Sequence, residues 1–234
     1  MILLLETATS TCSAALAHNG QLIAERHSDQ PNAHSSQLSL FIQSLLKENG
    51  LQSKDIQAVC VSSGPGSYTG LRIGVSSAKG FCYALQIPLL AVSTLESMAA
   101  YYYSQHPDYR GMVCSMIDAR RMECYSAIFG PADTGVRPQQ IKEVSADIIE
   151  PGCYDRYLDR GEVTFIGDGA LKTEPILGNH RNARYDASFS INAMGMALIA
   201  EEKLAHNEFE DVAYFEPFYL KDFVAKKSVV RGLS

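Results

Sequence analysis

The sequence of 234 residues lacks several features that would fix a function class at once. No apolar run approaches the roughly 18 residues of a membrane-spanning helix, and the apolar start Met1–Leu5 has no basic leader and no small-residue cleavage site. The formal net charge is −6, so the broad basic face of a nonspecific nucleic-acid binder is not expected. These absences predict a cytoplasmic globular protein with no membrane contact, built as one large domain or two smaller ones.

Cysteine and histidine lack the spacings of redox and metal sites. The six cysteines contain no CxxC pair and most lie in apolar runs, which predicts buried, reduced thiols. No HExxH or HxxxH pair occurs, so no metal site is predicted. No GxSxG elbow occurs either, and a protease would need a nucleophile or a metal that these patterns do not supply.

Apolar strands alternate with helices in the first hundred residues, and this alternation predicts a mixed α/β sheet with crossover connections. Period-2 and period-3.6 patterns, turn residues and caps define the elements. The predicted strands are Met1–Glu6, Cys12–Ala17, Gln21–His27, Ile56–Ser62 and Pro88–Val92, and the predicted helices span 35–49, 69–85 and 93–103.

The pattern restarts after residue 104 in a shorter form, which indicates a duplicated architecture. The elements expected there are strands Met112–Ile117, Met122–Phe129, Gln140–Val144 and Val163–Ile166 and a helix over 191–205. We therefore predict an α/β half at 1–104, a smaller one at 105–220 and a polar tail at 221–234. A cleft between the halves would be lined by the turns 7–11 and 118–121 and the loops 63–67 and 167–169.

A glycine-rich loop opens the second predicted helix. It is not a Walker A motif, because no Lys-Ser/Thr pair follows at the required spacing, and its third glycine comes one position too late for GxGxxG. One interpretation is a phosphate loop made by Gly64, Gly66, Ser67 and Gly70 at a helix N-terminus. The other is a tight turn with close helix packing through Gly70 and Gly74.

The helix that follows this loop is built from small and apolar residues, with only Arg72 and Lys79 charged, so it must be covered on more than one side. Together with the helix at 35–49, it predicts a hydrophobic interface with another protein; the alternative is cover by a helix of the same chain. The predicted contact residues are Leu38, Leu40, Phe41 and Leu45 on the first helix and Ile73, Gly74, Ser77 and Phe81 on the second. Ile73→Glu or Gly74→Arg is expected to block pairing and leave the fold intact.

Four sequence blocks resemble the bacterial TsaB (YeaZ) family. They are ILLLETATSTCSAAL, GPGSYTGLRIGVSSAKGF, IPLLAVSTLESMA and PFYLK. The likeness is strong over residues 1–100 and looser beyond. It implies the duplicated actin/sugar-kinase/heat-shock-protein-like (ribonuclease H-like) fold, with two halves around a cleft.

The resemblance also implies a role in making the N6-threonylcarbamoyl group on adenosine 37 of tRNAs that read codons starting with A. The expected partners are a TsaD-like catalytic paralogue, a TsaE-like ATPase and a second copy of the chain, with tRNA contacted only indirectly or weakly. No tightly bound cofactor is expected for this chain, although the assembled complex could bind ATP or ADP.

Comparison with the catalytic paralogue predicts a subunit without catalytic residues. TsaD-like proteins carry an HxxxH metal pair where this chain has Thr94 and Met98, and neither side chain suits the hard or borderline ion of that site. Glu96 is retained, and a capping box with Ser93 would explain it. The alternative function is an ATP-binding phosphotransferase or ATPase, for which Glu6 and Asp168 are the candidate acids.

Overall fold

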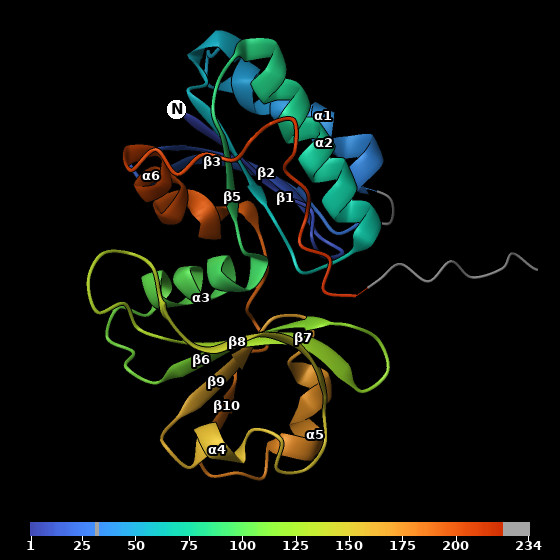
Figure 1. Cartoon of the computed structure of the whole chain (residues 1–234), viewed down its shortest axis with the longest axis vertical. Helices are drawn as coiled ribbons and strands as arrows, with labels where there is room; N and C mark the ends of the chain where they lie inside the picture. Colours follow the sequence, from blue (N-terminus) through green and yellow to red (C-terminus); the bar gives the residue numbers. More distant parts are fainter. Residues whose placement is uncertain (31–32, 222–234) are drawn as a thin grey trace, which may run out of the picture.

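The computed structural model describes residues 1–30 and 33–221, and its strands form two five-stranded sheets stacked one above the other with helices between and outside them (Figure 1). Apart from Lys221, the predicted polar tail 221–234 lies outside the described residues. Within the described ranges, no helix has the length and apolar character needed to cross a membrane.

The first sheet has the strand order β3-β2-β1-β4-β5, with β1 antiparallel to β2 and parallel to β4. Its elements in chain order are β1 (Ile2–Glu6), β2 (Cys12–His18), β3 (Gln21–Ser28), α1 (Ala33–Glu48), the 3-10 turn η1 (Ser53–Asp55), β4 (Ala58–Ser62), α2 (Tyr68–Leu85), β5 (Leu89–Val92) and α3 (Thr94–Gln105). The predicted strands and helices of this half are confirmed to within a few residues.

The second sheet has the order β10-β9-β6-β7-β8, with β6 antiparallel to β7 and parallel to β9. Its elements are β6 (Met112–Asp118), β7 (Glu123–Gly130), β8 (Gln139–Ile148), α4 (Asp155–Leu158), β9 (Val163–Ile166), η2 (Leu171–Thr173), α5 (Glu174–Leu177), β10 (Ala183–Tyr185), η3 (Ala193–Met196) and α6 (Ala197–Ala205). Each strand has a counterpart in the first sheet, so the predicted duplication is confirmed.

The outer face of the first sheet is covered by two long helices, α1 and α2, which lie side by side (Figure 1). Leu38 and Leu45 of α1 and Val75 of α2 form one buried cluster with Leu3 and Leu5 of β1. In the second half the corresponding helices, α4 and α5, have only four residues each. The second half is therefore the shorter version that the sequence predicts.

The third helix of each half packs on the sheet of the other half. α3 follows β5 yet contacts β6 and β7, whereas η3 and α6 follow β10 yet contact β1 and β2. Met196 and Ile199 lie in one cluster with Ile2 and Leu4 of the first sheet. α3 and the segment formed by η3 and α6 thus tie the two halves together.

Candidate functional site

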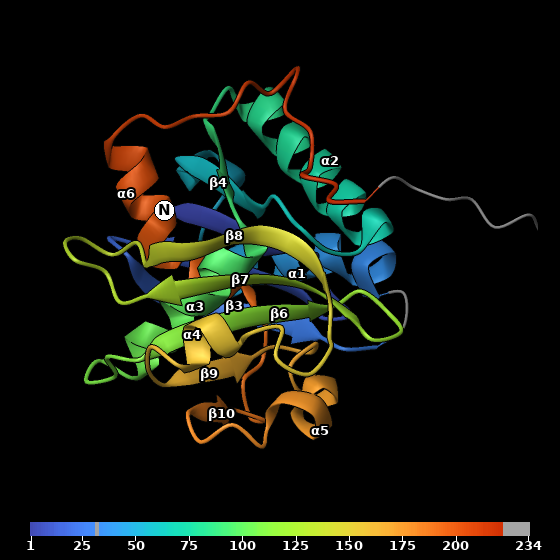
Figure 2. The ribbon, with the colours of Figure 1, turned by 60° about the horizontal axis from the view of Figure 1, so that its bottom comes forward.

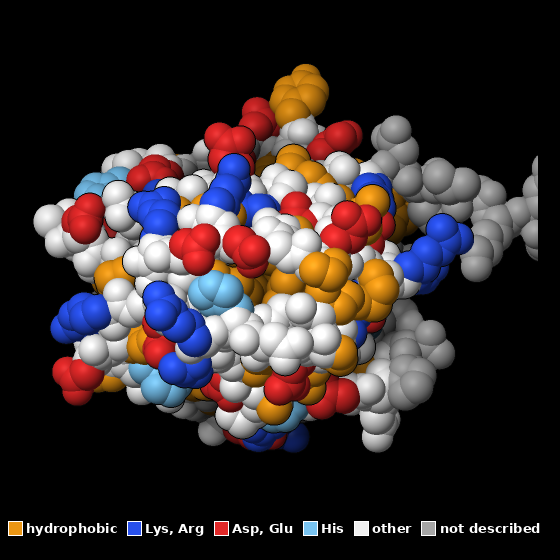
Figure 3. Space-filling view, turned by 90° about the horizontal axis from the view of Figure 1, so that it is seen from below, with side chains coloured by type: hydrophobic (Ala, Val, Ile, Leu, Met, Phe, Trp, Pro, Cys, Tyr) orange, Lys and Arg blue, Asp and Glu red, His pale blue; other side chains and the backbone are white. Residues whose placement is uncertain are grey.

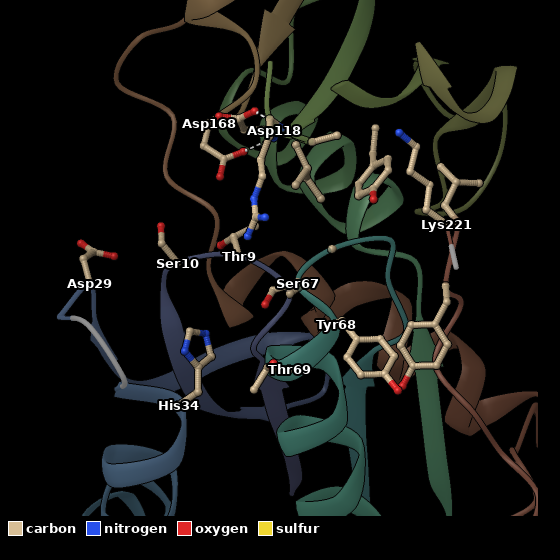
Figure 4. Close-up of a pocket in the computed structure, with 18 of the residues that line it drawn as sticks. Thr9, Ser10, Asp29, His34, Ser67, Tyr68, Thr69, Asp118, Asp168 and Lys221 are labelled. Atoms are coloured by element: carbon tan, nitrogen blue, oxygen red, sulfur yellow. Dashed lines mark hydrogen bonds between the residues drawn. The ribbon is translucent and has the colours of Figure 1, made fainter. Parts of the chain in front are cut away.

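A cleft of about 670 Å³ lies between the halves, and the four loops expected to line it all do so (Figure 4). Ala8, Thr9 and Ser10 come from the β1–β2 turn, and Gly66 and Ser67 from the loop after β4. The wall from the second half is made by the β6–β7 turn 118–120 and by residue 168 after β9. This convergence follows from topology, because each loop leaves a central strand of its sheet at the edge that faces the other half.

The glycine-rich loop is pressed against the β1–β2 turn. A Cβ atom on Gly66 would lie 2.2 Å from the carbonyl oxygen of Ala8, and one on Gly70 would lie 2.1 Å from that of Thr7. At Gly74 the same atom would lie 2.2 Å from Thr7 Oγ1. These distances are far shorter than any contact a real Cβ makes, so the three glycines are required for packing alone.

Two backbone N–H groups at the N-terminus of α2 already have hydrogen-bond partners within the protein. Ser67 caps the helix by accepting the N–H of Gly70 at 3.3 Å, and its own N–H donates to Ala8 O at 2.6 Å. The phosphate loop at Gly64, Gly66, Ser67 and Gly70 stays a prediction. Because close packing already accounts for the glycines, their presence no longer argues for a phosphate.

Asp118 and Asp168 lie next to each other on the wall formed by the second half (Figure 4). Asp168 accepts the N–H of Asp118 at 3.0 Å, and desolvation by the surrounding protein raises its pKa although the side chain reaches solvent. Burial also opposes ionisation of Asp118, but hydrogen bonds from the Lys172 ammonium and the N–H of Arg120 outweigh it and lower the pKa of Asp118. Asp118 is therefore the more readily ionised of the two acids, and Asp168 holds its proton more tightly.

Glu6 lies beneath the opposite wall and is fully buried. Its Oε1 accepts the N–H of Ala8 at 2.6 Å and the hydroxyl of Ser62 at 2.9 Å. Burial raises the pKa of Glu6 to about 7, against the lowering effect of these hydrogen bonds. Glu6 does not line the cleft, so only Asp168 of the two candidate acids is open to a ligand.

Thr94 and Met98 point into the protein interior. Thr94 is completely buried, and Met98 belongs to the same buried cluster as Leu95 and Ile166. A Cβ atom on Gly167 would lie 2.4 Å from Met98 Cε, so the thioether fills the space beneath the loop after β9. Both side chains thus contribute to the packing of the interior in this chain.

The capping box predicted at Ser93 and Glu96 is wrong. Ser93 occupies the N-cap position of α3, but its hydroxyl makes no capping hydrogen bond. Glu96 is instead partly buried, and desolvation raises its pKa against the opposing charges of Arg137 and Lys203. Glu96 therefore lies near Arg137 of the β7–β8 loop and Lys203 of α6, and it does not cap α3.

Three of the predicted interface residues face inward. Leu38 and Leu45 are buried in the core of the first half, and Gly74 is buried against Thr7. These assignments are wrong because the apolar stripe of α1 is occupied by its own sheet, and a glycine has no side chain to show its face. Gly74→Arg would disrupt the fold, contrary to the expectation above.

The remaining predicted interface residues reach the surface to different degrees. Leu40 is 51% exposed, and Phe41, Ile73 and Phe81 are partly buried at the edge of the core. Ser77 is also partly buried, and its hydroxyl donates to the carbonyl of Ile73 at 2.8 Å. Their role in an interface stays a prediction.

One side of the cleft comes from Tyr219, Leu220 and Lys221, which the sequence analysis does not predict. The ring of Tyr219 lies 4.8 Å from that of Tyr68 at the start of α2. The sole sequence signal is the block PFYLK, which carries the family likeness without indicating a position in the fold. In residues 1–30 and 33–221, no group of three or more His, Cys, Asp or Glu side chains could hold a metal.

Comparisons with known proteins agree with this architecture. The family described as TsaD, tRNA N6-adenosine threonylcarbamoyltransferase, matches residues 22–151. The tRNA threonylcarbamoyladenosine biosynthesis protein TsaB of Escherichia coli K12 is 30% identical over 233 residues, which are 97% of each chain. TsaB of Bacillus subtilis 168 is 37% identical over 224 residues, or 94% of this chain and 93% of that one.

A solved structure shows the same likeness over nearly the whole chain. YeaZ from Pseudomonas aeruginosa aligns with a TM-score of 0.81 and 26% sequence identity, covering 94% of this chain and 99% of that one. The duplicated sheets, the close-packed glycine loop and these relatives lead to one conclusion: the chain belongs to the TsaB (YeaZ) family.

Proposed function

We propose that this chain is a partner subunit without catalytic residues in the N6-threonylcarbamoylation of adenosine 37 in tRNAs that read ANN codons. In this proposal it binds and activates a TsaD-like catalytic paralogue. The single observation that carries the proposal is the burial of Thr94 and Met98, at the positions of the paralogue's metal ligands, in the chain's own core. A site filled by a threonine and a thioether offers a hard ion no suitable ligands.

The outer faces of α1 and α2 are the proposed contact surface for the paralogue. The half-exposed Leu40 and the partly buried Phe41, Ile73 and Phe81 lie on these neighbouring helices. In protein interfaces a few well-packed side chains near the centre supply most of the binding free energy. A second copy of the chain would bind the same surface, so the homodimer and the complex with the paralogue would exclude each other.

We further propose that a TsaE-like ATPase joins the complex and that tRNA contacts this subunit only indirectly or weakly. The net charge of −6 supports the second point. On the face of the second half seen in Figure 3, Lys and Arg side chains are interspersed with Asp and Glu. No tightly bound cofactor is proposed for this chain, and ATP or ADP would belong to the assembled complex.

The alternative, an ATP-binding phosphotransferase or ATPase, is supported by one observation. Asp168 reaches the cleft, next to the charged Asp118, where a nucleotide-bound metal would need a carboxylate. ATP hydrolysis by the isolated protein that is lost in Asp168→Ala would favour this function over the partner role.

The contact surface can be tested with two matched leucines. Leu40→Glu on α1 is expected to weaken binding to the TsaD-like subunit by about tenfold or more, because a charge would be desolvated in an apolar contact. Leu171→Glu is the control, since Leu171 is 48% exposed, similar to Leu40, but lies in the second half. Binding would be measured by light scattering and titration, and tRNA modification in parallel. Equal affinity of both variants would contradict the proposed surface.

A further inference from the structure

The segment Glu208–Lys221, here called the strap, follows α6 and runs over β5 and along α2 to the mouth of the cleft (Figures 1 and 2). It contains no helix and only one isolated strand-like bridge. Such a segment gains little from its own backbone hydrogen bonding, so its course is set by the contacts it makes with the two halves.

Both ends of the strap are held by ion pairs to the second half. At its start, Glu208 accepts a hydrogen bond from Arg137 of the β7–β8 loop at 2.8 Å. At its end, Lys221 pairs with Glu123 at the beginning of β7. The side chains of Glu208 and Lys221 are 39% and 45% exposed. Pairs of this kind are weak and are screened by salt.

The middle of the strap is held by the first half. The N–H of Glu210 donates to Leu89 O of β5 at 2.8 Å, and the N–H of Phe218 donates to Ser63 O at 2.7 Å. Lys79 of α2 donates to two strap carbonyls, each at 3.1 Å. Phe215 packs against the apolar cluster of the first half. These contacts outnumber the two ion pairs, and they include the apolar packing of Phe215.

The C-terminal end of the strap crosses the cleft. Between its anchor at Phe218 on the first half and its ion pair with Glu123 on the second, the strap spans the mouth with Tyr219, Leu220 and Lys221. Tyr219 stays on the first half, against the ring of Tyr68. A rotation of one half away from the other must therefore break the pair between Lys221 and Glu123 or detach Phe218.

We propose that the strap fixes the opening between the two halves and that the ion pair Lys221–Glu123 is its releasable clasp. Domain closure in two-lobed proteins is set by a few contacts that bridge the lobes, and weak bridging contacts permit reversible opening. The clasp is the weaker anchor, because it is a single ion pair between partly exposed side chains. The first half holds the strap through the backbone hydrogen bond from Phe218 to Ser63 and through the Lys79 ammonium, which donates to two strap carbonyls. Opening thus begins at the clasp and leaves the strap on α2.

The test uses the full chain with spin labels on exposed positions of the two halves. Ser76→Cys on α2 and Glu143→Cys on β8 carry the labels in a Cys153→Ser background, because Cys153 is exposed and the other five cysteines are buried. Lys221→Ala and Glu123→Gln are compared with Lys221→Arg and with the charge swap Lys221→Glu/Glu123→Lys. Distances between labels and hydrogen exchange of the Phe218 amide are measured in each.

Loss of the clasp is expected to broaden the distance distribution toward longer values in Lys221→Ala and Glu123→Gln. Lys221→Arg and the charge swap should keep the unaltered distribution. The Phe218 amide should exchange no more than about fivefold faster, as a single exposed ion pair permits. An unchanged distribution in both single variants overturns the proposal, as does faster exchange at Phe218 without any change in distance, because the strap would then not set the opening.

Discussion

The first strand of each half ends in a carboxylate, and the two carboxylates behave in opposite ways. Glu6 accepts the N–H of Ala8 at 2.6 Å, and Asp118 accepts the N–H of Arg120 at 2.7 Å, so each holds the turn two residues ahead. Yet burial raises the pKa of Glu6 to about 7, whereas Lys172 and the turn N–H overcome desolvation and lower that of Asp118. Equivalent backbone positions therefore do not imply equivalent chemistry.

The difference arises from the helices that follow. In the first half the long α2 lies over the β1–β2 turn, and Gly70 and Gly74 bring it within contact of Thr7. In the second half the equivalent helix α5 has four residues, and Asp118 is left open to the cleft. A duplicated fold can thus bury the acid of one half and keep the other in solvent by changing the length of one helix.

The contact between α2 and the turn is the most sensitive point of this comparison. Gly70→Ala and Gly74→Ala should each lower the free energy of unfolding by about 3 kcal/mol or more, because the new Cβ would lie on an oxygen of Thr7. Gly80→Ala in the same helix is the control, since a Cβ there meets nothing within 4 Å, and it should stabilise by up to about 1 kcal/mol. Urea denaturation measures all three. Equal effects at Gly74 and Gly80 would show that the helix does not depend on this contact.

The glycine after β9 extends the test to the second half. Gly167 has φ +97°, and a Cβ on it would lie 2.3 Å from the carbonyl oxygen of Met116. Gly167→Ala should cost about 2–3 kcal/mol, and Gly161→Ala, where a Cβ meets nothing within 4 Å, should cost far less. If thermal unfolding shows both variants to be equally stable, the loop after β9 does not depend on a close glycine contact as the start of α2 does.

The buried Glu6 predicts a pH dependence of stability. Folding raises its pKa from an ordinary value of 4.5 to about 7, so the folded state keeps a proton that the unfolded chain releases. The stabilisation is therefore complete below about pH 4.5 and is lost as pH rises through 7, by about 2–3 kcal/mol. Glu6→Gln does not titrate. Its stability relative to the unaltered protein should rise by this amount between pH 5 and 8, and a constant difference would contradict the assigned pKa.

Asp118 predicts the opposite slope and a smaller effect. Its lowered pKa means that it stabilises the fold above the ordinary value of 3.8 and loses this contribution as pH falls. Lys172→Ala removes its partner and two further hydrogen bonds, to the carbonyls of Arg121 and Glu123, and should cost about 1 kcal/mol at neutral pH. Lys172→Arg, the control, should retain most of the stability. No loss in Lys172→Ala would mean that solvent already screens the pair.

Periodicity alone predicts the strands and long helices of the first half, because each has a continuous buried face such as Leu38 and Leu45 on α1. It does not predict α4, α5 and β10, which have four, four and three residues and too few positions to show a period. The predicted helix 191–205 divides into η3 and α6, and no residue pattern marks that division. The strap is missed for a related reason, since its path is fixed by contacts such as Phe218 with Ser63 that are distant in sequence.

The site shows a similar split between what sequence can and cannot reveal. The loops that line the cleft are predictable from turn residues and topology, whereas the inward face of Gly74 is not, because glycine carries no side chain to mark its orientation. The burial of Glu6 is also invisible in sequence, since it depends on the length and placement of α2. The orientation of Gly74 and the burial of Glu6 both depend on tertiary packing, which a local sequence pattern does not show.

The most direct test of the account is tRNA threonylcarbamoylation reconstituted from this chain, the TsaD-like and TsaE-like subunits and the threonylcarbamoyl-adenylate donor. Thr94→Ala, Met98→Leu and Asp168→Asn should each retain the initial rate to within about twofold, provided that light scattering shows an intact complex. Modification should require the chain and fall in Leu40→Glu. If Asp168→Asn or Met98→Leu abolishes transfer while the complex still assembles, this chain carries chemistry, and its role as a partner subunit without catalytic residues is wrong.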